Sequence, residues 1–312
     1  MILTSLVAAV VPMSFYLILL WRFDKYEREP LKLVIFHFLW GATISVIIGF
    51  AWSKLISIPI QTVITNQEIV GFIQIILIAP FVEELSKGAL LFRTMKDNRF
   101  DYLTDGLVYG AAIGLGFGMT ENFLYFITFG NTIPNLLWLI VIRSAFSAVM
   151  HGMATAAFGA LLSISKYSKN RNKKLLIVVG IIIAMSIHFI WNFSVSFSNT
   201  FLFGLFFMFI IFIIFLFVFS YSLKFEKRII SEKLIDEIPE TFIPILISTF
   251  RYKEGWFVEK FRKEFITSAI KLAFRKHELE ISSEKVEFYK DEIENLRIRI
   301  AELLKLNFNN TI

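Results

Sequence analysis

A group of ionisable residues stands out inside an apolar stretch of this sequence. In APFVEELSKG, residues 79–88, the side chains of Glu83, Glu84 and Lys87 fall within five positions. A charged side chain at the centre of a membrane helix costs roughly 2.5–3.5 kcal/mol, so such groups are candidates for function by default. Glu83 and Lys87 are four residues apart and can pair on one helix face, which would offset part of that cost. Glu84 points to a different face, so we expect at most one of the two carboxylates to meet water directly.

Three further apolar stretches carry polar residues of the same kind. In chain order these are Glu121, Asn122, Arg143, His151, His188 and Asn192. Counted at about 1.5 Å per residue from the nearest charged flank, Glu84, His188, His151 and Glu121 lie roughly 18, 21, 22 and 24 Å into their helices. We therefore expect carboxylates and imidazoles from four helices to meet in one layer near the middle of the bilayer.

Such a layer could activate water in two ways, and the sequence leaves both open. In the first, a glutamate, with Glu83 as our choice, acts as general base, while His188 and Asn192 stabilise an oxyanion. In the second, Glu83, His151 and His188 bind zinc, which acidifies the water. The chain has no cysteine and neither an HExxH nor a GxSxG motif, so a thiol nucleophile is excluded.

A row of small residues is expected to set how closely these groups approach one another. Glycines occur at four-residue intervals from Gly106 to Gly118, and Asn122 continues the row. Small residues at this spacing let helix backbones pack closely in a membrane. The row would press its helix into the bundle and place Glu121 beside the neighbouring helices.

The composition predicts that these elements are membrane-spanning helices. Hydrophobic residues make up 56% of the 312 positions, phenylalanine contributes 36, and the mean hydropathy is +0.66. A soluble domain would be roughly 45–50% apolar. Since a span needs about 20 apolar residues, we predict an all-α bundle of about seven spans. The spans are expected near residues 1–21, 32–53, 69–92, 105–130, 134–164, 175–197 and 200–223.

The loops between these spans alternate in basic content, which predicts the orientation of the bundle. Loops 22–32, 93–103 and 165–174 are rich in Lys and Arg, including Arg99, Lys169 and Arg171. Loop 54–68 has a single lysine, and loops 131–133 and 198–199 have none. Because basic residues concentrate on the cytoplasmic side, we expect the N-terminus outside and the C-terminal tail in the cytoplasm.

The charge divides the chain into a membrane domain at 1–224, with its core at 69–197, and a cytoplasmic helical tail at 225–312. Residues 1–224 contain 16 basic and 10 acidic side chains, whereas the tail contains 16 of each. A charge-balanced tail gives no support for nucleic-acid binding. The natural partner of the membrane domain is the lipid bilayer itself.

The tail has apolar residues at heptad spacing, typical of helix packing. They are Val286, Tyr289, Ile293, Leu296, Ile300 and Leu303, after an expected helix cap at Ser282 or Ser283. An imperfect heptad runs upstream from Val258 to Leu279. Two arrangements fit this pattern: an antiparallel hairpin turning near 280–283, or a homo-oligomer in which second helices of two chains pair in parallel.

Four blocks of this sequence together resemble the PrsW family of bacterial intramembrane proteases, related to CAAX prenyl endopeptidases and bacteriocin-immunity proteins. The blocks are EELSK, DGLVYGAAIGLGFGMTEN, RSAFSAVMHGMATAAFG and HFIWN, in family order within residues 70–195. The resemblance implies that the paired glutamates are Glu83 and Glu84, that the later acidic position is Glu121, and that the histidines are His151 and His188. His188 and Asn192 match a block that supports the oxyanion in the CAAX relatives, whereas Lys87 stands where those relatives bear arginine.

The resemblance also implies an activity, a substrate and a location. The expected activity is an endopeptidase of the bacterial cytoplasmic membrane that cuts a membrane-tethered protein, typically a single-span anti-sigma factor, in envelope-stress or antimicrobial-peptide signalling. Zinc dependence and a metal-free glutamate mechanism both stay open. An ion or proton transporter with a midplane carboxylate site and a non-catalytic immunity or scaffold protein are the alternatives.

Overall fold

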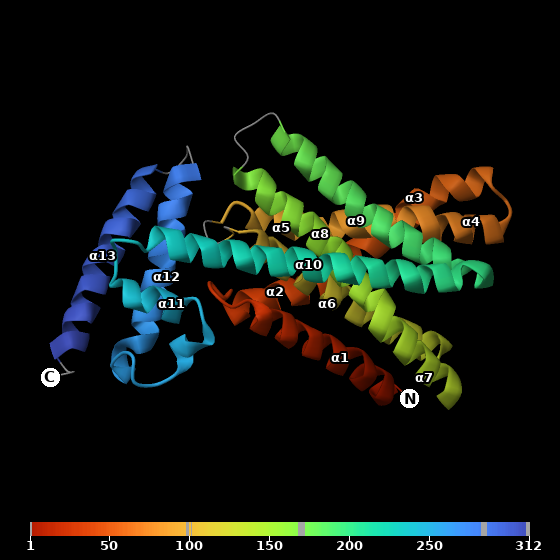
Figure 1. The fold of residues 1–312 in the computed structure, drawn as a ribbon. Helices are drawn as coiled ribbons and strands as arrows, with labels where there is room; N and C mark the ends of the chain where they lie inside the picture. Colours follow the sequence, from red (N-terminus) through yellow and green to blue (C-terminus); the bar gives the residue numbers. More distant parts are fainter. Residues whose placement is uncertain (1, 98–99, 101, 168–171, 282–285, 310–312) are drawn as a thin grey trace. The chain divides into compact units, whose positions relative to one another are not determined.

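The computed structural model describes residues 2–97, 100, 102–167, 172–281 and 286–309, and these residues form helices joined by short loops, without a strand (Figure 1). The all-α fold predicted from the sequence is confirmed. Arg99, Lys169, Arg171 and the expected cap at Ser282 or Ser283 lie outside the described residues.

The N-terminal part of the chain contains long helices, three of which include a short π-helical turn. The elements are α1 (Ile2–Phe23), α2 (Leu31–Trp40), η1 (Gly41–Ser45), α3 (Val46–Val63), α4 (Gln67–Ile73), η2 (Gln74–Ile78), α5 (Ala79–Thr94), α6 (Leu103–Phe129), α7 (Ile133–Ile142), η3 (Arg143–Ser147), α8 (Ala148–Tyr167), α9 (Asn172–Ser196), η4 (Ser198–Thr200) and α10 (Phe201–Lys233). The π turns η1, η2 and η3 each join two helices into one continuous rod. Such turns inside α-helices are frequent at functional sites.

Six of these helical segments, within the described residues, are long and apolar enough to cross a membrane. They are α1, α2–α3, α4–α5, α7–α8, α9 and η4–α10. The expected span near 105–130 is α6, whose five glycines and polar residues dilute its hydropathy. With 27 residues, α6 is about 40 Å long at the usual helical rise. A polytopic membrane protein is thus confirmed, while seven spans and an outside N-terminus stay predictions.

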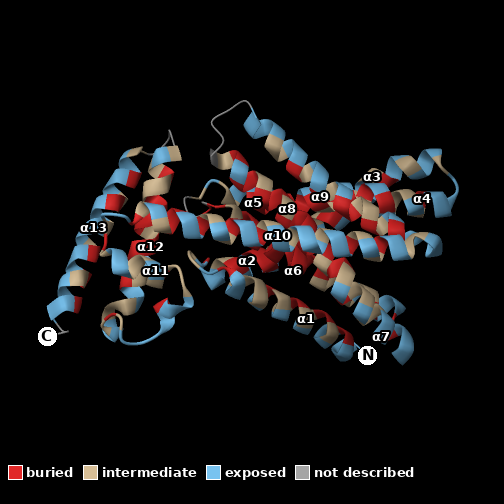
Figure 2. Cartoon of the chain, in the orientation of Figure 1, coloured by how far each residue is buried: buried red, intermediate tan, exposed pale blue. Residues whose placement is uncertain are grey.

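The chain divides into two compact units, of which the first consists of the residues up to Phe23 together with Glu29–Phe219. Helix α6 is its centre, because every residue from Thr104 to Gly118 is buried. The outward sides of the surrounding helices expose large apolar side chains, such as Phe203, Phe206 and Phe217 on α10, as expected of lipid-facing surfaces (Figure 2).

The glycines of α6 allow its backbone to lie directly against that of α8. A methyl group added at Gly106, Gly110 or Gly114 would overlap a backbone carbonyl group of α8. At Gly114 the overlapped group is that of His151. The close packing predicted for this row is confirmed, and it brings the middle of α8 next to the middle of α6.

The second unit consists of Asp24–Arg28 and the chain from Ser220 onward. Beyond α10 it contains η5 (Glu240–Phe242), α11 (Ile243–Leu246), η6 (Thr249–Tyr252), α12 (Glu259–Ile281) and α13 (Val286–Asn309). Helices α12 and α13 pack together, with ion pairs of Lys271 and Arg275 to Glu292. This is the hairpin arrangement of the tail, although its turn lies outside the described residues.

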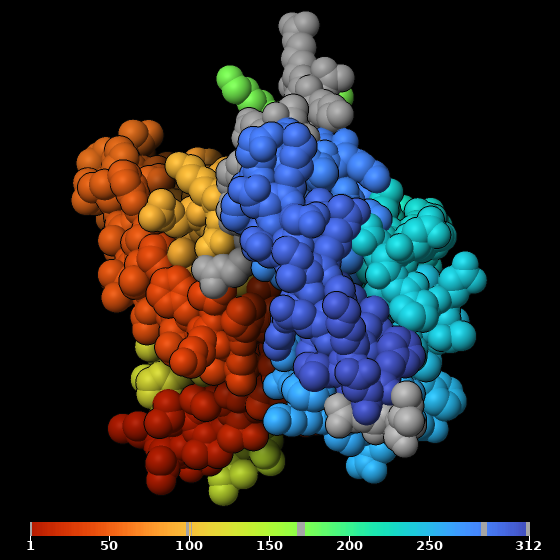
Figure 3. Space-filling model, turned by 90° about the vertical axis from the view of Figure 1, so that its left-hand side faces the viewer, coloured from red at the N-terminus to blue at the C-terminus, as the bar shows by residue number. Residues whose placement is uncertain are grey.

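The α12–α13 hairpin buries Phe265 and Leu272 of the first helix and Ile293, Ile300 and Leu303 of the second. The opposite side of α13 is exposed, and its residues are seen in dark blue in the space-filling view (Figure 3). The division of the chain into a protease domain at 1–224 and a functionally separate tail stays a prediction.

The packing of α6 on α8 can be tested with one added methyl group. We expect Gly114→Ala to destabilise the protein by about 1–3 kcal/mol, because a packed backbone must move to accept the side chain. Gly71→Ala is the matched control, since a methyl group there meets no atom within 4 Å. Thermal unfolding in detergent should show a lower midpoint for the first variant alone. Equal midpoints would contradict the account of the close approach.

Candidate active site

The ionisable residues predicted from four helices meet in one cluster within the first unit. Glu83, Glu84 and Lys87 come from α5, Glu121 from α6, His151 from α8 and His188 from α9. The imidazole rings of His151 and His188 lie edge to face, with centroids 4.6 Å apart. The expected layer is therefore assembled by side chains that are up to 105 positions apart in the sequence, from Glu83 to His188.

Lys87 is the centre of this cluster, and its side chain is fully buried. Its Nζ lies 2.7 Å from Glu84 Oε1, 2.8 Å from His151 Nδ1 and 4.0 Å from the centroid of the Phe117 ring. An ammonium group can only donate hydrogen bonds, so His151 accepts at Nδ1 and carries its hydrogen on Nε2. That nitrogen lies 2.8 Å from Glu121 Oε2 and donates to it.

Glu84 is the buried carboxylate of the pair, with 1% of its surface exposed. Besides Lys87, it accepts hydrogen bonds from His188 Nδ1 at 3.0 Å and from Thr155 Oγ1 at 3.2 Å. With Nδ1 donating to this carboxylate, the neutral His188 ring has its lone pair on Nε2. Glu84 thus orients the second imidazole, in the way that carboxylates orient the histidines of metal sites.

Glu83 occupies the more open side of the cluster, because 17% of its side chain is exposed. Its Oε2 lies 3.9 Å from His188 Nε2 and 3.8 Å from Lys87 Nζ. This oxygen is covered and has no hydrogen-bond partner among the described residues. A buried carboxylate oxygen without a partner is costly, so a water molecule or an ion beside it would be stabilising. As predicted, one carboxylate of the pair is accessible and the other is not.

The same three residues could hold a metal ion. One ligand atom each from Glu83, His151 and His188 lie within 4.8 Å of one another. Two imidazole nitrogens and one carboxylate oxygen are a known ligand set of catalytic zinc. The unpartnered Oε2 of Glu83 and the free Nε2 lone pair of His188 fit this use. His151 would fit it through Nε2 once that nitrogen has passed its hydrogen to Glu121 and Nδ1 has taken a proton from Lys87, so that the ring stays neutral.

Arg143 balances the charge of Glu121 from the start of η3. Its guanidinium lies 2.7 Å from Glu121 Oε2, donates to Asn122 Oδ1 at 3.2 Å and stacks over the ring of Tyr125. Arg143 is therefore the counter-charge of Glu121. Sequence reasoning missed the contributions of Tyr125 and of Thr155, although Thr155 lies four residues after His151, on the same helix face.

Three polar residues take no part in the hydrogen bonds of the cluster around Lys87. The side-chain amide of Asn192 donates to the carbonyl oxygen of Ile75 at 2.9 Å and thereby connects α9 to η2. Its role at an oxyanion stays a prediction. His37 bonds to Thr94 and to the Leu33 carbonyl group, and His277 belongs to the second unit. Neither histidine belongs to the cluster around Lys87.

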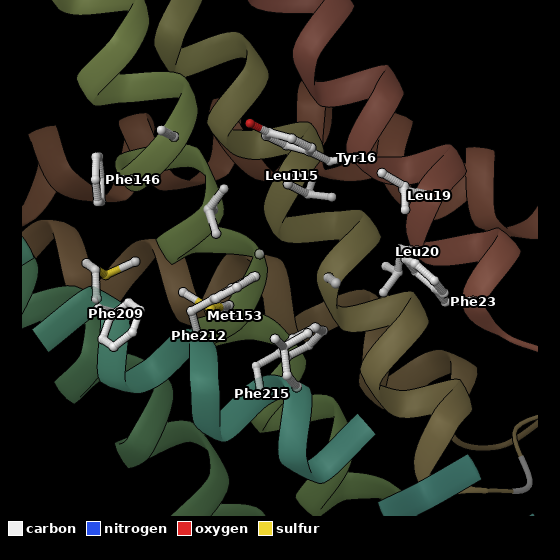
Figure 4. Close-up of a pocket in the computed structure, with 16 residues that line it drawn as sticks. Tyr16, Leu19, Leu20, Phe23, Leu115, Phe146, Met153, Phe209, Phe212 and Phe215 are labelled. Atoms are coloured by element: carbon white, nitrogen blue, oxygen red, sulfur yellow. The ribbon is translucent and has the colours of Figure 1, made fainter. Parts of the chain in front are cut away.

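The first unit also contains a cavity of about 470 Å³ between α1, α6, α8 and α10 (Figure 4). It is lined almost wholly by carbon, with Leu19, Leu115, Met153 and Phe212 among the residues that point toward it (Figure 4). Tyr16 supplies a hydroxyl group, but no carboxylate or imidazole lines the cavity. It cannot activate water, so the candidate active site is the cluster around Lys87.

Buried carboxylates and imidazoles inside a helical membrane bundle are the groups that a membrane-embedded hydrolase needs. The family model of PrsW family intramembrane metalloproteases matches residues 29–219, and this chain belongs to that family. The chain is therefore an intramembrane protease and a multi-pass protein of the bacterial cell membrane, as predicted.

Relatives named Protease PrsW support the assignment. The protein of Clostridioides difficile (strain 630) is 27% identical over 187 residues, which cover 59% of this chain and 76% of the relative. That of Bacillus subtilis (strain 168) is 25% identical over 173 residues, covering 54% and 72%. That of Geobacillus kaustophilus (strain HTA426) is 33% identical over 132 residues, covering 41% and 55%. No solved structure matches the chain.

Removing the buried ammonium group should destabilise the whole first unit. We expect Lys87→Met to cost about 3–5 kcal/mol of folding free energy, because Glu84 would be left as an unpaired buried charge. Lys54→Met is the control, since Lys54 is exposed. The measurement is unfolding in mixed micelles.

The double variant Glu84→Gln with Lys87→Met should recover part of the loss, because both charges are gone. A Lys87→Met protein as stable as the wild type would show that the ion pair does not hold the cluster together.

Proposed function

We propose that this protein is an endopeptidase that cuts a membrane-tethered protein, with a single-span anti-sigma factor as the substrate class. The observation that carries the proposal is the convergence of Glu83, His151 and His188, whose ligand atoms lie within 4.8 Å of one another inside a helical membrane bundle. The choice of an anti-sigma factor, and of an envelope-stress signal, rests on the resemblance to the family.

Glu83 is our proposed general base. Its side chain is the more exposed of the paired carboxylates, and its Oε2 makes no hydrogen bond to a described residue that would have to be broken. In the reaction, the oxygen of a water molecule attacks the scissile carbonyl carbon while Glu83 takes a proton from that water. The carboxyl group of Glu83 then returns the proton to the leaving nitrogen, the C–N bond breaks, and the products are a carboxylic acid and an amine. General-base catalysis by a positioned carboxylate typically contributes about 10²–10⁴-fold in rate.

The remaining residues hold these groups in place and balance their charges. Lys87 fixes the rotamers of Glu84 and His151 through two hydrogen bonds. Glu84 orients His188, and Glu121, neutralised by Arg143, is placed to accept the Nε2 hydrogen of His151. We propose that His188 and Asn192 stabilise the oxyanion where the reaction proceeds without a metal.

For the alternative mechanism we propose zinc as the cofactor, held by Glu83, His151 and His188, in which case Glu83 is a metal ligand and not the general base. Zinc bound there would supply Lewis-acid activation and lower the pKa of water to about 7. The description of the family as metalloproteases favours this reading over a metal-free glutamate mechanism.

The general-base assignment is tested by Glu83→Gln, which keeps the size of the side chain and removes its basicity. We expect cleavage of a tagged single-span substrate by the purified protein to fall at least about a hundredfold, with insertion and thermal stability retained. Glu68→Gln, at an exposed position of α4, should leave the rate unchanged. Retained cleavage by a folded Glu83→Gln protein would rule out Glu83 as the base.

Metal dependence is tested by elemental analysis of the same preparation. We expect about one zinc per chain, loss of cleavage after dialysis against a chelator, and recovery on adding zinc alone. The variant His151→Ala with His188→Ala should contain no zinc even before dialysis. Full activity of a protein freed of metal would leave the metal-free glutamate mechanism as the account of cleavage.

A further inference from the structure

The second unit contains a cavity whose walls are strongly basic. Its volume is about 520 Å³, within the usual range of small-ligand sites. The cations that line it come from two parts of the chain: Lys25 and Arg28 from the segment after α1, and Arg251, Arg262, Lys263 and Lys271 from the tail. The acidic residue among the lining residues is Glu27.

Arg251 is the buried cation of this cavity, with 4% of its surface exposed. Its guanidinium donates to the carbonyl oxygens of Leu246 and Lys25 and to the hydroxyl group of Tyr252. All three acceptors are neutral, and Nε has no acceptor among the described residues. The rings of Tyr26 and Tyr252 lie 4.9 and 4.8 Å from the guanidinium carbon. Aromatic contacts offset part of the cost of this buried charge, but no carboxylate neutralises it within the described chain.

Two of the other cations are free to bind a ligand. The side chains of Lys25 and Lys263 are exposed, and neither has an ion-pair partner within the described part of the chain. By contrast, Arg262 pairs with Glu259, and Lys271 pairs with Glu292 at 2.9 Å. Lys25, Arg251 and Lys263 therefore present three positive charges to a cavity whose acidic lining residue is Glu27.

We propose that this cavity binds a phosphate group, supplied by the headgroup of an anionic phospholipid. A guanidinium with an open donor and two flexible ammonium groups are the donors that phosphate oxygens prefer. Tyr26 to Arg28 are part of a loop that begins one residue after α1 and ends before α2. The covalent chain thus keeps one wall of the cavity close to the membrane surface, where headgroups are concentrated. Basic pockets in such positions bind anionic lipids in other membrane proteins.

The inference is independent of the proteolytic mechanism, because none of the residues involved belongs to the cluster around Lys87. It concerns the tail, which lies beyond the region matched by the family model. A lipid held here would link the loop after α1 to the start of α12 through one ligand. If no headgroup reached the cavity, the same cations would bind a soluble phosphate ion.

The test uses the full chain in nanodiscs of phosphatidylcholine with or without phosphatidylglycerol, analysed by native mass spectrometry. We expect the wild type to retain phosphatidylglycerol and the variant Lys25→Gln with Lys263→Gln to bind it roughly tenfold more weakly or worse. Lys260→Gln with Lys305→Gln removes the same charge from exposed positions of the same unit that do not line the cavity. This control should bind as the wild type does.

A second arm titrates inorganic phosphate into protein in pure phosphatidylcholine nanodiscs, followed by calorimetry. Retention of phosphatidylglycerol that depends on Lys25 and Lys263 supports a lipid headgroup as the ligand. Phosphate binding that depends on the same two lysines, without selective lipid retention, overturns the lipid source and keeps the anion site. Equal binding by the cavity variant and the control variant in both arms overturns the proposal.

Discussion

The ammonium group of Lys87 is the constraint on which the arrangement of the cluster depends. A charge buried this deeply among apolar helices must be paired or it would not be tolerated. Its two short hydrogen bonds, to Glu84 and to His151, determine which nitrogen of His151 carries hydrogen and hence what Glu121 accepts. Through Glu84 it also influences His188. One cation thereby fixes the geometry of two carboxylates and two imidazoles, and it leaves Glu83 as the carboxylate with an unpartnered oxygen.

Close packing of α6 against α8 brings the partners of the Lys87 ammonium group within reach of it. The glycines of α6 let α8 approach until backbone carbonyl groups touch the positions where side chains would otherwise stand. Without that approach, His151 could not reach both Lys87 and Glu121. The π turns contribute in the same region. The turn η3 begins at Arg143. The turn η2 leads directly into α5, and its Ile75 carbonyl oxygen accepts a hydrogen bond from the side-chain amide of Asn192. The helices are thus irregular where the site is built, as is usual for functional segments.

Much of this could be predicted from the sequence, because depth in a membrane helix follows from residue counting. Residue counting predicts that one layer contains Glu83, Glu84, Glu121, His151 and His188. The unequal exposure of Glu83 and Glu84 could also be predicted, because the two lie on different helix faces. The partner of Lys87 was harder to predict: positions i,i+3 and i,i+4 are both neighbours on a helix, and Glu84 at 2.7 Å is closer than Glu83 at 3.8 Å. The bond of Asn192 to Ile75 depends on where η2 widens the helix, which no residue spacing indicates. In the tail, the heptads fit a hairpin and a dimer equally well, since both bury the same seam.

The central claim is that Glu83, His151 and His188 face one shared space in which water is activated. Anomalous scattering at the zinc edge from the protein crystallised in a lipid phase tests it most directly. The account predicts one peak, about 2.0–2.2 Å from an oxygen of Glu83 and from a ring nitrogen of each histidine. A structure in which Glu83 turns toward lipid, or in which zinc binds away from both imidazoles, would contradict it.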